Sequence, residues 1–140
     1  MTVIDIENDE SRTGSSVGRT IPRWTRACLL DHLIAGRGVA VLLRGGRQAA
    51  LIRTEAGVLY AVGNIDPAGR AAVMSRGIVG DRAGVPVLAS PLLKQVYSLE
   101  DGQCLDDPAL SLPVFAVRVD DGIVSVSDEP ITLEHAATGG

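Results

Sequence analysis

Short apolar runs recur along the chain at close spacing and are separated by turns rich in glycine and acidic residues. Seven such runs follow one another after residue 37, namely GVAVLLRGG, RQAALIRT, GVLYAVGN, VPVLASP, KQVYSLEDG, LPVFAVRVDDG and IVSVSDEP. Runs of this length that are rich in valine and bounded by turn residues are typical of β-strands rather than helices. The pattern therefore predicts an all-β fold, an antiparallel β-sandwich or small barrel.

Two stretches have the pattern of a β-hairpin. In FAVRVDDGIVSVS, residues 115–127, apolar residues alternate with others on both sides of an Asp-Asp-Gly turn, and ALIRTEAGVLYAVG, residues 50–63, is the second such stretch. One segment alone has helical spacing, LLDHLIAGRG at residues 29–38, with Asp31 near its start and Gly36 as a stop signal. A short helix is therefore expected there.

The composition along the chain divides it into an arm, one domain and a tail. Residues 1–22 are polar, of mixed charge and without periodicity, which predicts a disordered N-terminal arm. Residues 23–127 carry the strand pattern and are long enough to form a single domain with its own core. Residues 128–140 mix proline, glutamate and threonine, end in Gly-Gly, and are expected to form a flexible tail.

The composition also narrows the class of protein. Hydrophobic residues make up 46% of the chain but aromatic residues only 3%, so the core must be aliphatic. The formal net charge is -4, which argues against a nucleic-acid partner. No apolar run reaches the roughly 18 residues of a membrane span, and the N-terminus lacks the pattern of a signal peptide. We therefore expect a cytoplasmic protein whose Cys28 and Cys104 are reduced thiols.

No set of residues in the sequence has the pattern of a catalytic centre. His32 lies on a short polar turn and His135 lies in the tail, so neither is a good candidate for a general base. No glycine-rich phosphate loop opens a helix. Together with Cys28 and Cys104 the two histidines make up a Cys2His2 inventory, but their spacing fits no usual zinc site. Buried thiols and solvated histidines are the simpler interpretation, and no catalytic or metal-binding residue is predicted.

The strand rhythm is interrupted by two long segments that are rich in turn residues. They are VGNIDPAGRAAVMSRG at residues 62–77 and LASPLLKQVYSLEDGQ at residues 88–103. Loops of this length inside a compact domain are usually functional or disordered. Apolar residues in and just after the first segment favour a loop that packs onto the domain; these are Ala71, Val73, Met74 and Ile78.

These two segments resemble the cluster-binding loops of the Rieske [2Fe-2S] domain family. In that family the first loop carries Cys-x-His and the second carries Cys-x-x-His. Asn64 and Asp66 stand at the first pair of positions here, and Ser90 and Leu93 stand at the second. The strings GNIDP, SRG, ASPLLKQ and DGQCLDDP, in that order, are similar more narrowly to the small subunits of cytosolic NAD(P)H-dependent nitrite reductases, over about residues 24–127.

The residue types at these positions do not suit an iron–sulfur cluster. A Rieske cluster needs two thiolates on one iron and two imidazoles on the other. Asn64, Asp66, Ser90 and Leu93 supply neither donor, so we expect vestigial ligand positions and no cofactor in this chain. Turn-closing hydrogen bonds and an apolar plug at Leu93 would then hold the loops.

The resemblance implies a Rieske-like β-sandwich with a two-loop insertion and a non-catalytic role in an oxidoreductase. The chain would be the small subunit of an assimilatory nitrite reductase, which converts nitrite to ammonium with electrons from NADH or NADPH. The large subunit would carry the FAD, the iron–sulfur cluster and the sirohaem. A free-standing interaction module derived from a Rieske ferredoxin is the alternative, and a true Rieske-type ferredoxin is opposed by the missing ligands.

Basic residues gather in and beside the two loops. Arg70, Arg76 and Arg82 belong to the first region, and Lys94, the single lysine of the chain, belongs to the second. Cations at one end of a net-acidic protein can steer it onto an acidic patch. These four residues are the predicted partner interface, and a merely solvated rim is the alternative.

Overall fold

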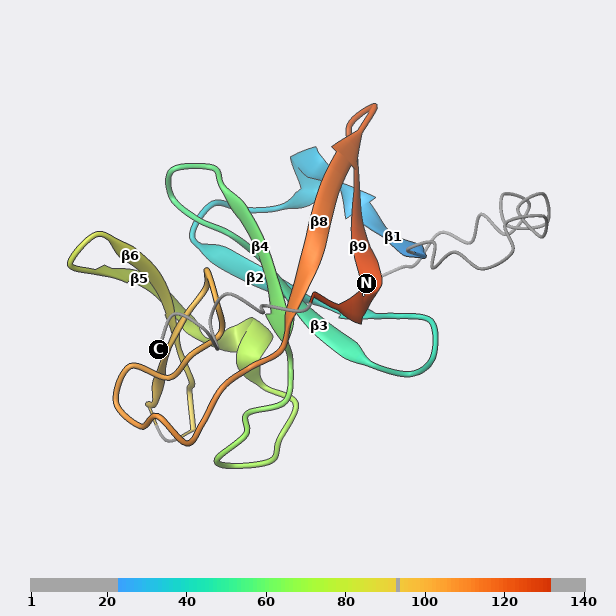
Figure 1. The fold of residues 1–140 in the computed structure, drawn as a ribbon. Helices are drawn as coiled ribbons and strands as arrows, with labels where there is room; N and C mark the ends of the chain where they lie inside the picture. The colour runs from blue at the N-terminus through green and yellow to red at the C-terminus, as the bar shows by residue number, and fades with distance from the viewer. Residues whose placement is uncertain (1–22, 93, 132–140) are drawn as a thin grey trace.

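The computed structural model of the protein describes residues 23–92 and 94–131 (Figure 1). The predicted arm at 1–22, the tail beyond residue 131 and Leu93 lie outside the described residues. Within the described ranges the chain forms nine strands, β1 (Trp24–Leu29), β2 (Arg37–Leu42), β3 (Gln48–Arg53), β4 (Leu59–Gly63), β5 (Ile78–Arg82), β6 (Val85–Ala89), β7 (Val96–Ser98), β8 (Val114–Asp120) and β9 (Ile123–Pro130). It also forms two short 3-10 helices, η2 (Leu30–His32) and η3 (Met74–Arg76).

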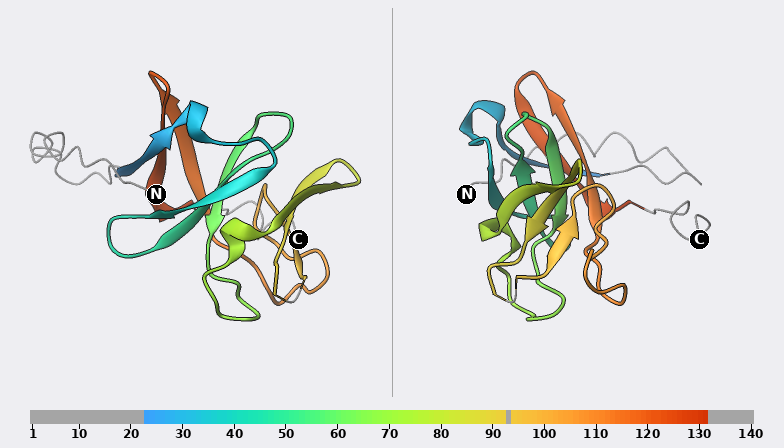
Figure 2. Two further views of the ribbon diagram at one scale, coloured as in Figure 1. Left: turned by 180° about the vertical axis from the view of Figure 1, so that it is seen from behind. Right: turned by 90° about the vertical axis from the view of Figure 1, so that its left-hand side faces the viewer.

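The strands form two antiparallel sheets. The larger sheet has six strands in the order β1-β9-β8-β4-β3-β2, and the smaller sheet has three in the order β5-β6-β7. The chain leaves the larger sheet after β4 and returns to it at β8, so residues 64–113 form a separate part, here called the lobe. Figures 1 and 2 show the lobe packed at one side of the larger sheet. This arrangement confirms the expected all-β antiparallel fold with a two-loop insertion.

Both predicted hairpins are present. In the β8–β9 pair Asp120 faces Ile123, and the intervening Asp121 and Gly122 have φ of 57° and 78°. Two successive positive φ values are those of a type I′ turn, whose twist matches the twist of the flanking strands. The β3–β4 pair closes with Arg53 facing Leu59. Local turn chemistry was therefore sufficient to identify these two pairs.

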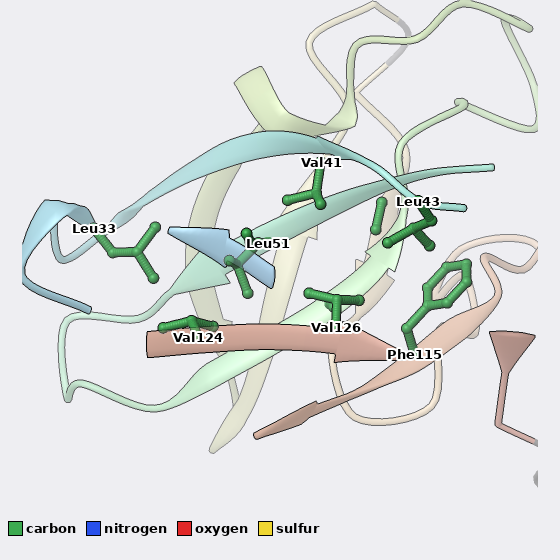
Figure 3. Packing of buried hydrophobic residues seen from close by; sticks show 10 residues of the cluster. Leu33, Val41, Leu43, Leu51, Phe115, Val124 and Val126 are labelled. Atoms are coloured by element: carbon green, nitrogen blue, oxygen red, sulfur yellow. The ribbon is translucent and has the colours of Figure 1, made fainter. Parts of the chain in front are cut away.

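The core has two parts, on opposite faces of the larger sheet. Figure 3 shows the first, which is almost wholly aliphatic and includes Leu33, Val41, Leu43, Leu51, Phe115, Val124 and Val126. The second lies between the sheet and the lobe and includes Ile52, Val62, Met74, Leu88, Tyr97, Leu99 and Cys104. Alternate residues of β3 point into the two parts, Leu51 into the first and Ile52 into the second. A strand buried on both faces carries a continuous apolar run, as the sequence AALI at residues 49–52 does.

The expected helix at residues 29–38 is wrong. The described chain has only the three-residue η2 there, and β2 begins at Arg37. Gly36 has φ of +82°, and its N–H donates to the carbonyl of Arg53 at 2.6 Å, so the segment is a turn that leads into an edge strand. A helix of this length has few hydrogen bonds of its own, and Leu33 alone of its apolar residues is buried in the core.

The first long segment contains more regular structure than its sequence suggested. Residues 62–77, expected to be a loop, include η3, and the edge strand β5 follows directly after them. Met74 is fully buried as expected, but Ile78 is 68% exposed, because β5 pairs with β6 alone and Ile78 faces outward. At the other end of the domain, β9 continues to Pro130, beyond the predicted boundary at residue 127.

No helix in the part of the chain that the structure describes is long and apolar enough to cross a membrane.

Gly102 predicts a large effect of adding one methyl group. Its φ is +79°, and a Cβ there would lie 2.0 Å from the carbonyl oxygen of Leu112, whereas Gly57, at φ of +90°, has open space around it. Gly102→Ala should destabilise the protein by about 3 kcal/mol or more, and Gly57→Ala by about 1 to 2 kcal/mol from backbone strain alone. Urea unfolding of both variants measures the difference, and equal losses would contradict the close packing around Gly102.

Candidate functional site

The first of the two lobe loops follows β4 and is closed by its own backbone. The N–H of Asp66 donates to the carbonyl of Ala71 at 2.9 Å, and the N–H of Arg70 donates to the carbonyl of Asp66 at 2.6 Å. Arg70 has a φ of 64°, a backbone conformation that residues other than glycine rarely adopt. A proline follows Asp66 and stiffens the start of the turn.

The second loop, which follows β6, repeats this pattern. The N–H of Ser90 donates to the carbonyl of Gln95 at 2.8 Å, and the N–H of Lys94 donates to the carbonyl of Ser90 at 3.0 Å. Lys94 has a φ of 61°, and a proline follows Ser90. By hydrogen-bond pattern, Ser90 is therefore the counterpart of Asp66, and Lys94 is the counterpart of Arg70.

The two counterparts are bonded to each other. The hydroxyl of Ser90 donates to Oδ2 of Asp66 at 2.5 Å, and both residues are buried. The other carboxylate oxygen, Oδ1, accepts the N–H of Ala68 at 2.9 Å. The N–H of Leu92 in turn donates to the Ser90 hydroxyl oxygen at 3.2 Å. This Asp66–Ser90 link joins the two loops across 24 positions of sequence.

The surroundings of Asp66 favour its charged form. Burial by itself would raise the pKa of this carboxyl, but hydrogen bonds from Ser90 and from the backbone N–H groups of Ala68 and Gly69 outweigh it and lower the pKa. The hydroxyl of Tyr97 also lies near Asp66 and lowers the pKa of its carboxyl further. The Tyr97 hydroxyl does not meet the criteria for a hydrogen bond with any described residue. Burial and the neighbouring Asp66 carboxylate raise the pKa of Tyr97 to about 12. The site therefore holds one carboxylate beside neutral hydroxyls.

Asn64 does not take part in this link. Its side-chain N–H donates to Oε1 of Gln48 at 3.1 Å, and its Oδ1 accepts the N–H of Ser75 at 2.7 Å. These bonds fasten the first loop to β3 and to η3. Of the four residues at the predicted vestigial positions, the structure thus joins Asp66 and Ser90, places Asn64 on a different contact, and leaves Leu93 outside the described residues.

The donor set of the loops does not fit a [2Fe-2S] cluster. Such a cluster requires thiolate and imidazole ligands, whereas Asp66 and Ser90 present oxygen atoms that are already bonded to each other. Cys28 is a half-buried free thiol in β1 whose pKa is raised by burial, and Cys104 is a buried free thiol after β7. Across the described residues no three metal-binding side chains gather, and His135 of the zinc alternative lies beyond them.

The four predicted interface cations lie on different elements of the lobe. Arg70 and Lys94 are exposed at matching positions of the two joined loops. Arg76 instead belongs to η3, and Arg82 ends β5, where it forms an exposed ion pair with Asp106 at 3.1 Å. Arg70 and Lys94 are therefore the two that occupy matching positions of the loop hydrogen-bond pattern.

Sequence reasoning missed Leu92, which covers the first loop from the second. A Cβ added at Gly69 would lie 2.8 Å from Cδ1 of Leu92 and 3.4 Å from Oδ2 of Asp66, so the Leu92 side chain lies directly over this turn. Leu92 is nevertheless 46% exposed. The repeated pattern of Asp or Ser, then Pro, then a cation three residues after the proline, was the signal that could have aligned the loops correctly.

Removal of the Ser90 hydroxyl should weaken the lobe. Ser90→Ala leaves the buried Asp66 carboxylate without its closest donor, which we expect to cost about 2 to 3 kcal/mol of unfolding free energy. Ser75→Ala is the matched control, because the Ser75 hydroxyl forms no hydrogen bond within the described residues. Urea unfolding is the measurement, and similar values for the two variants would contradict a stabilising Asp66–Ser90 link.

The lowered pKa of Asp66 predicts a pH dependence. Because the folded-state pKa lies below the unfolded one, the stability that the carboxylate contributes is fully present above about pH 4 and is lost as the pH falls through the folded value. Asp66→Asn should therefore flatten the fall in unfolding free energy below about pH 4. Urea unfolding from neutral to acidic pH checks this, and parallel curves for the variant and the unaltered protein would argue against it.

Comparison with known proteins identifies the family to which this fold belongs. A family model described as Rieske-like [2Fe-2S] domain matches residues 23–127. The nitrite reductase (NADH) small subunit of Salmonella typhimurium is 38% identical over 105 residues, which cover 74% of this chain and 96% of that protein. A crystal structure assigned as an NADH-dependent nitrite reductase small subunit from Mycobacterium tuberculosis is 54% identical, with a TM-score of 0.76, covering 80% of this chain and 100% of that one.

A third relative carries this kind of domain inside a longer chain. The nitrite reductase [NAD(P)H] large subunit of Klebsiella oxytoca is 37% identical over 115 residues, which are 82% of this chain but 12% of that protein. The matches to the separate small subunits span almost the whole of each relative, and the family model spans the whole folded domain. This chain therefore belongs to the Rieske-like [2Fe-2S] domain family and, within it, to the nitrite reductase (NADH) small subunits.

Proposed function

We propose that this chain is the small subunit of an NAD(P)H-dependent nitrite reductase, an oxidoreductase that converts nitrite to ammonium, and that it has no active site of its own. The observation that carries the proposal is the match over 96% of a relative that bears the name of that subunit. The partner is the large subunit of the same enzyme. We propose neither a nucleic-acid partner nor a membrane partner. We propose a cytoplasmic location, because unpaired thiols such as Cys28 and Cys104 are usual there.

The redox chemistry is assigned to the large subunit. Electron transfer from a nicotinamide to nitrite requires cofactors, and the resemblance to this family implies FAD, an iron–sulfur cluster and sirohaem on the larger chain. In this chain the two loops offer a carboxylate and a hydroxyl in place of thiolates and imidazoles. We therefore propose that it is free of cofactors and acts by docking on the large subunit and supporting its structure.

The domain inside the Klebsiella oxytoca large subunit supports docking. In that protein a segment like this chain is covalently attached to the remainder of the large subunit. When both domains belong to one polypeptide, each is present at a high effective concentration near the other, so a weak contact between them is sufficient. A separate small chain must achieve the same contact through its own surface, and this proposal assigns it that contact.

Purification of the tagged chain from its native cells tests the proposal. We expect it to bring down a large protein with sirohaem absorption, while the isolated chain is colourless and contains far less than one iron per molecule. Visible iron–sulfur absorption in the isolated chain would support a ferredoxin instead. Recovery of the chain without a large subunit at low salt would support a free-standing interaction module.

A further inference from the structure

Three exposed side chains lie at the outer end of the two joined loops. These are Arg70, Leu92 and Lys94, here called the loop-tip surface. The loops lie side by side at the lower end of the molecule in Figure 1, and they remain together in both views of Figure 2. Leu92 covers the first loop while leaving 46% of its surface to solvent. The surface thus combines an apolar residue with a cation from each loop.

The backbone of the two cations indicates that their side chains have a role beyond closing the loops. Among the residues that the structure describes, four other than glycine have positive φ, and two of them, Ala83 and Asp121, precede a glycine in hairpin turns. The other two are Arg70 and Lys94. Glycine would relieve this strain at both positions, yet each loop presents a long cationic side chain there. Backbone strain that the surrounding structure maintains is concentrated at functional sites.

Both cations are without a counter-ion in the described part of the chain. Arg82 and Arg47 form ion pairs with Asp106 and Glu129, whereas no such pair or side-chain hydrogen bond involves Arg70 or Lys94. The chain as a whole carries a formal net charge of -4. Two cations on the same pair of loops as an exposed leucine, on a protein of the opposite net charge, complement an acidic surface with an apolar centre.

We propose that the loop-tip surface is the contact through which this chain binds the large subunit, and that it meets an apolar depression there that is rimmed by carboxylates. This inference rests on the proposed function and adds the surface and the chemistry of its partner. Leu92 supplies the apolar anchor, and Arg70 and Lys94 pair with the carboxylates. The Asp66–Ser90 link holds the two loops together, so that the three side chains approach the partner as one unit.

Charge reversal at the two loops tests the proposal. We expect Arg70→Glu combined with Lys94→Glu to weaken binding to the purified large subunit by about tenfold or more, and to remove most of the salt dependence of the unaltered chain. Arg23→Glu combined with Arg37→Glu is the control, because it changes the net charge equally at exposed positions beside β1 and at the start of β2 in the larger sheet. The control should bind within about threefold of the unaltered chain. Isothermal titration at two salt concentrations measures all three proteins.

Leu92→Ala tests the apolar part separately. This variant keeps every charge and should weaken binding by about tenfold with its salt dependence intact. Circular dichroism and urea unfolding confirm that each variant is folded. If the Arg70/Lys94 variant binds the large subunit as tightly as the unaltered chain, the proposed contact surface is wrong and the proposed function still stands. The same conclusion follows if the control variant loses as much affinity as the Arg70/Lys94 variant. If the unaltered chain does not bind the large subunit, the proposed surface and the proposed function are both wrong. If instead the unaltered chain self-associates and only the Arg70/Lys94 variant loses this self-association, the surface binds a second copy of this chain.

Discussion

The hydrogen bond from Ser90 to Asp66 is the interaction on which the lobe depends. It joins two loops that share one backbone pattern and that follow different strands, β4 and β6. A hydrogen bond to an ionised acceptor is stronger than one between neutral groups, and burial strengthens it further. The backbone N–H groups that donate to Asp66 offset part of the free-energy cost of burying its charge. At these loops a hydrogen bond makes the link, whereas a Rieske cluster would require thiolate and imidazole ligands.

This substitution changes what the loops can contribute. A cluster held between two loops both cross-links them and carries an electron, whereas a hydrogen bond between Asp66 and Ser90 does only the first. Under the proposed function, the loop pair contributes its shape and the side chains displayed on it. In our proposal the lobe serves to recognise the partner, through Leu92 and the two cations Arg70 and Lys94. The larger sheet supports the lobe through the part of the core that lies between them.

The features that the sequence predicted correctly were those with local causes. The Asp-Asp-Gly turn specifies the β8–β9 hairpin by its own backbone preferences, and the apolar run at residues 49–52 matches a strand buried on both faces. The predicted helix at 29–38 was wrong because its apolar spacing was shared by a turn and the start of an edge strand. The strand β5 was missed because an edge strand such as this one, with Ile78 exposed, lacks the apolar signature of a buried one.

In the candidate site, too, the sequence predicted the features with local causes and missed those that depend on packing. The residue types alone determined that these loops hold no thiolate or imidazole, because donor chemistry belongs to the side chain wherever it lies. The pairing of the positions was a different matter: Asn64 and Asp66 looked equivalent in the sequence, and only the folded lobe turned Asn64 toward Gln48 and Asp66 toward Ser90. Sequence thus decided the chemistry and the local turns, while tertiary structure decided which groups meet, because contacts across 24 positions depend on how the sheets pack.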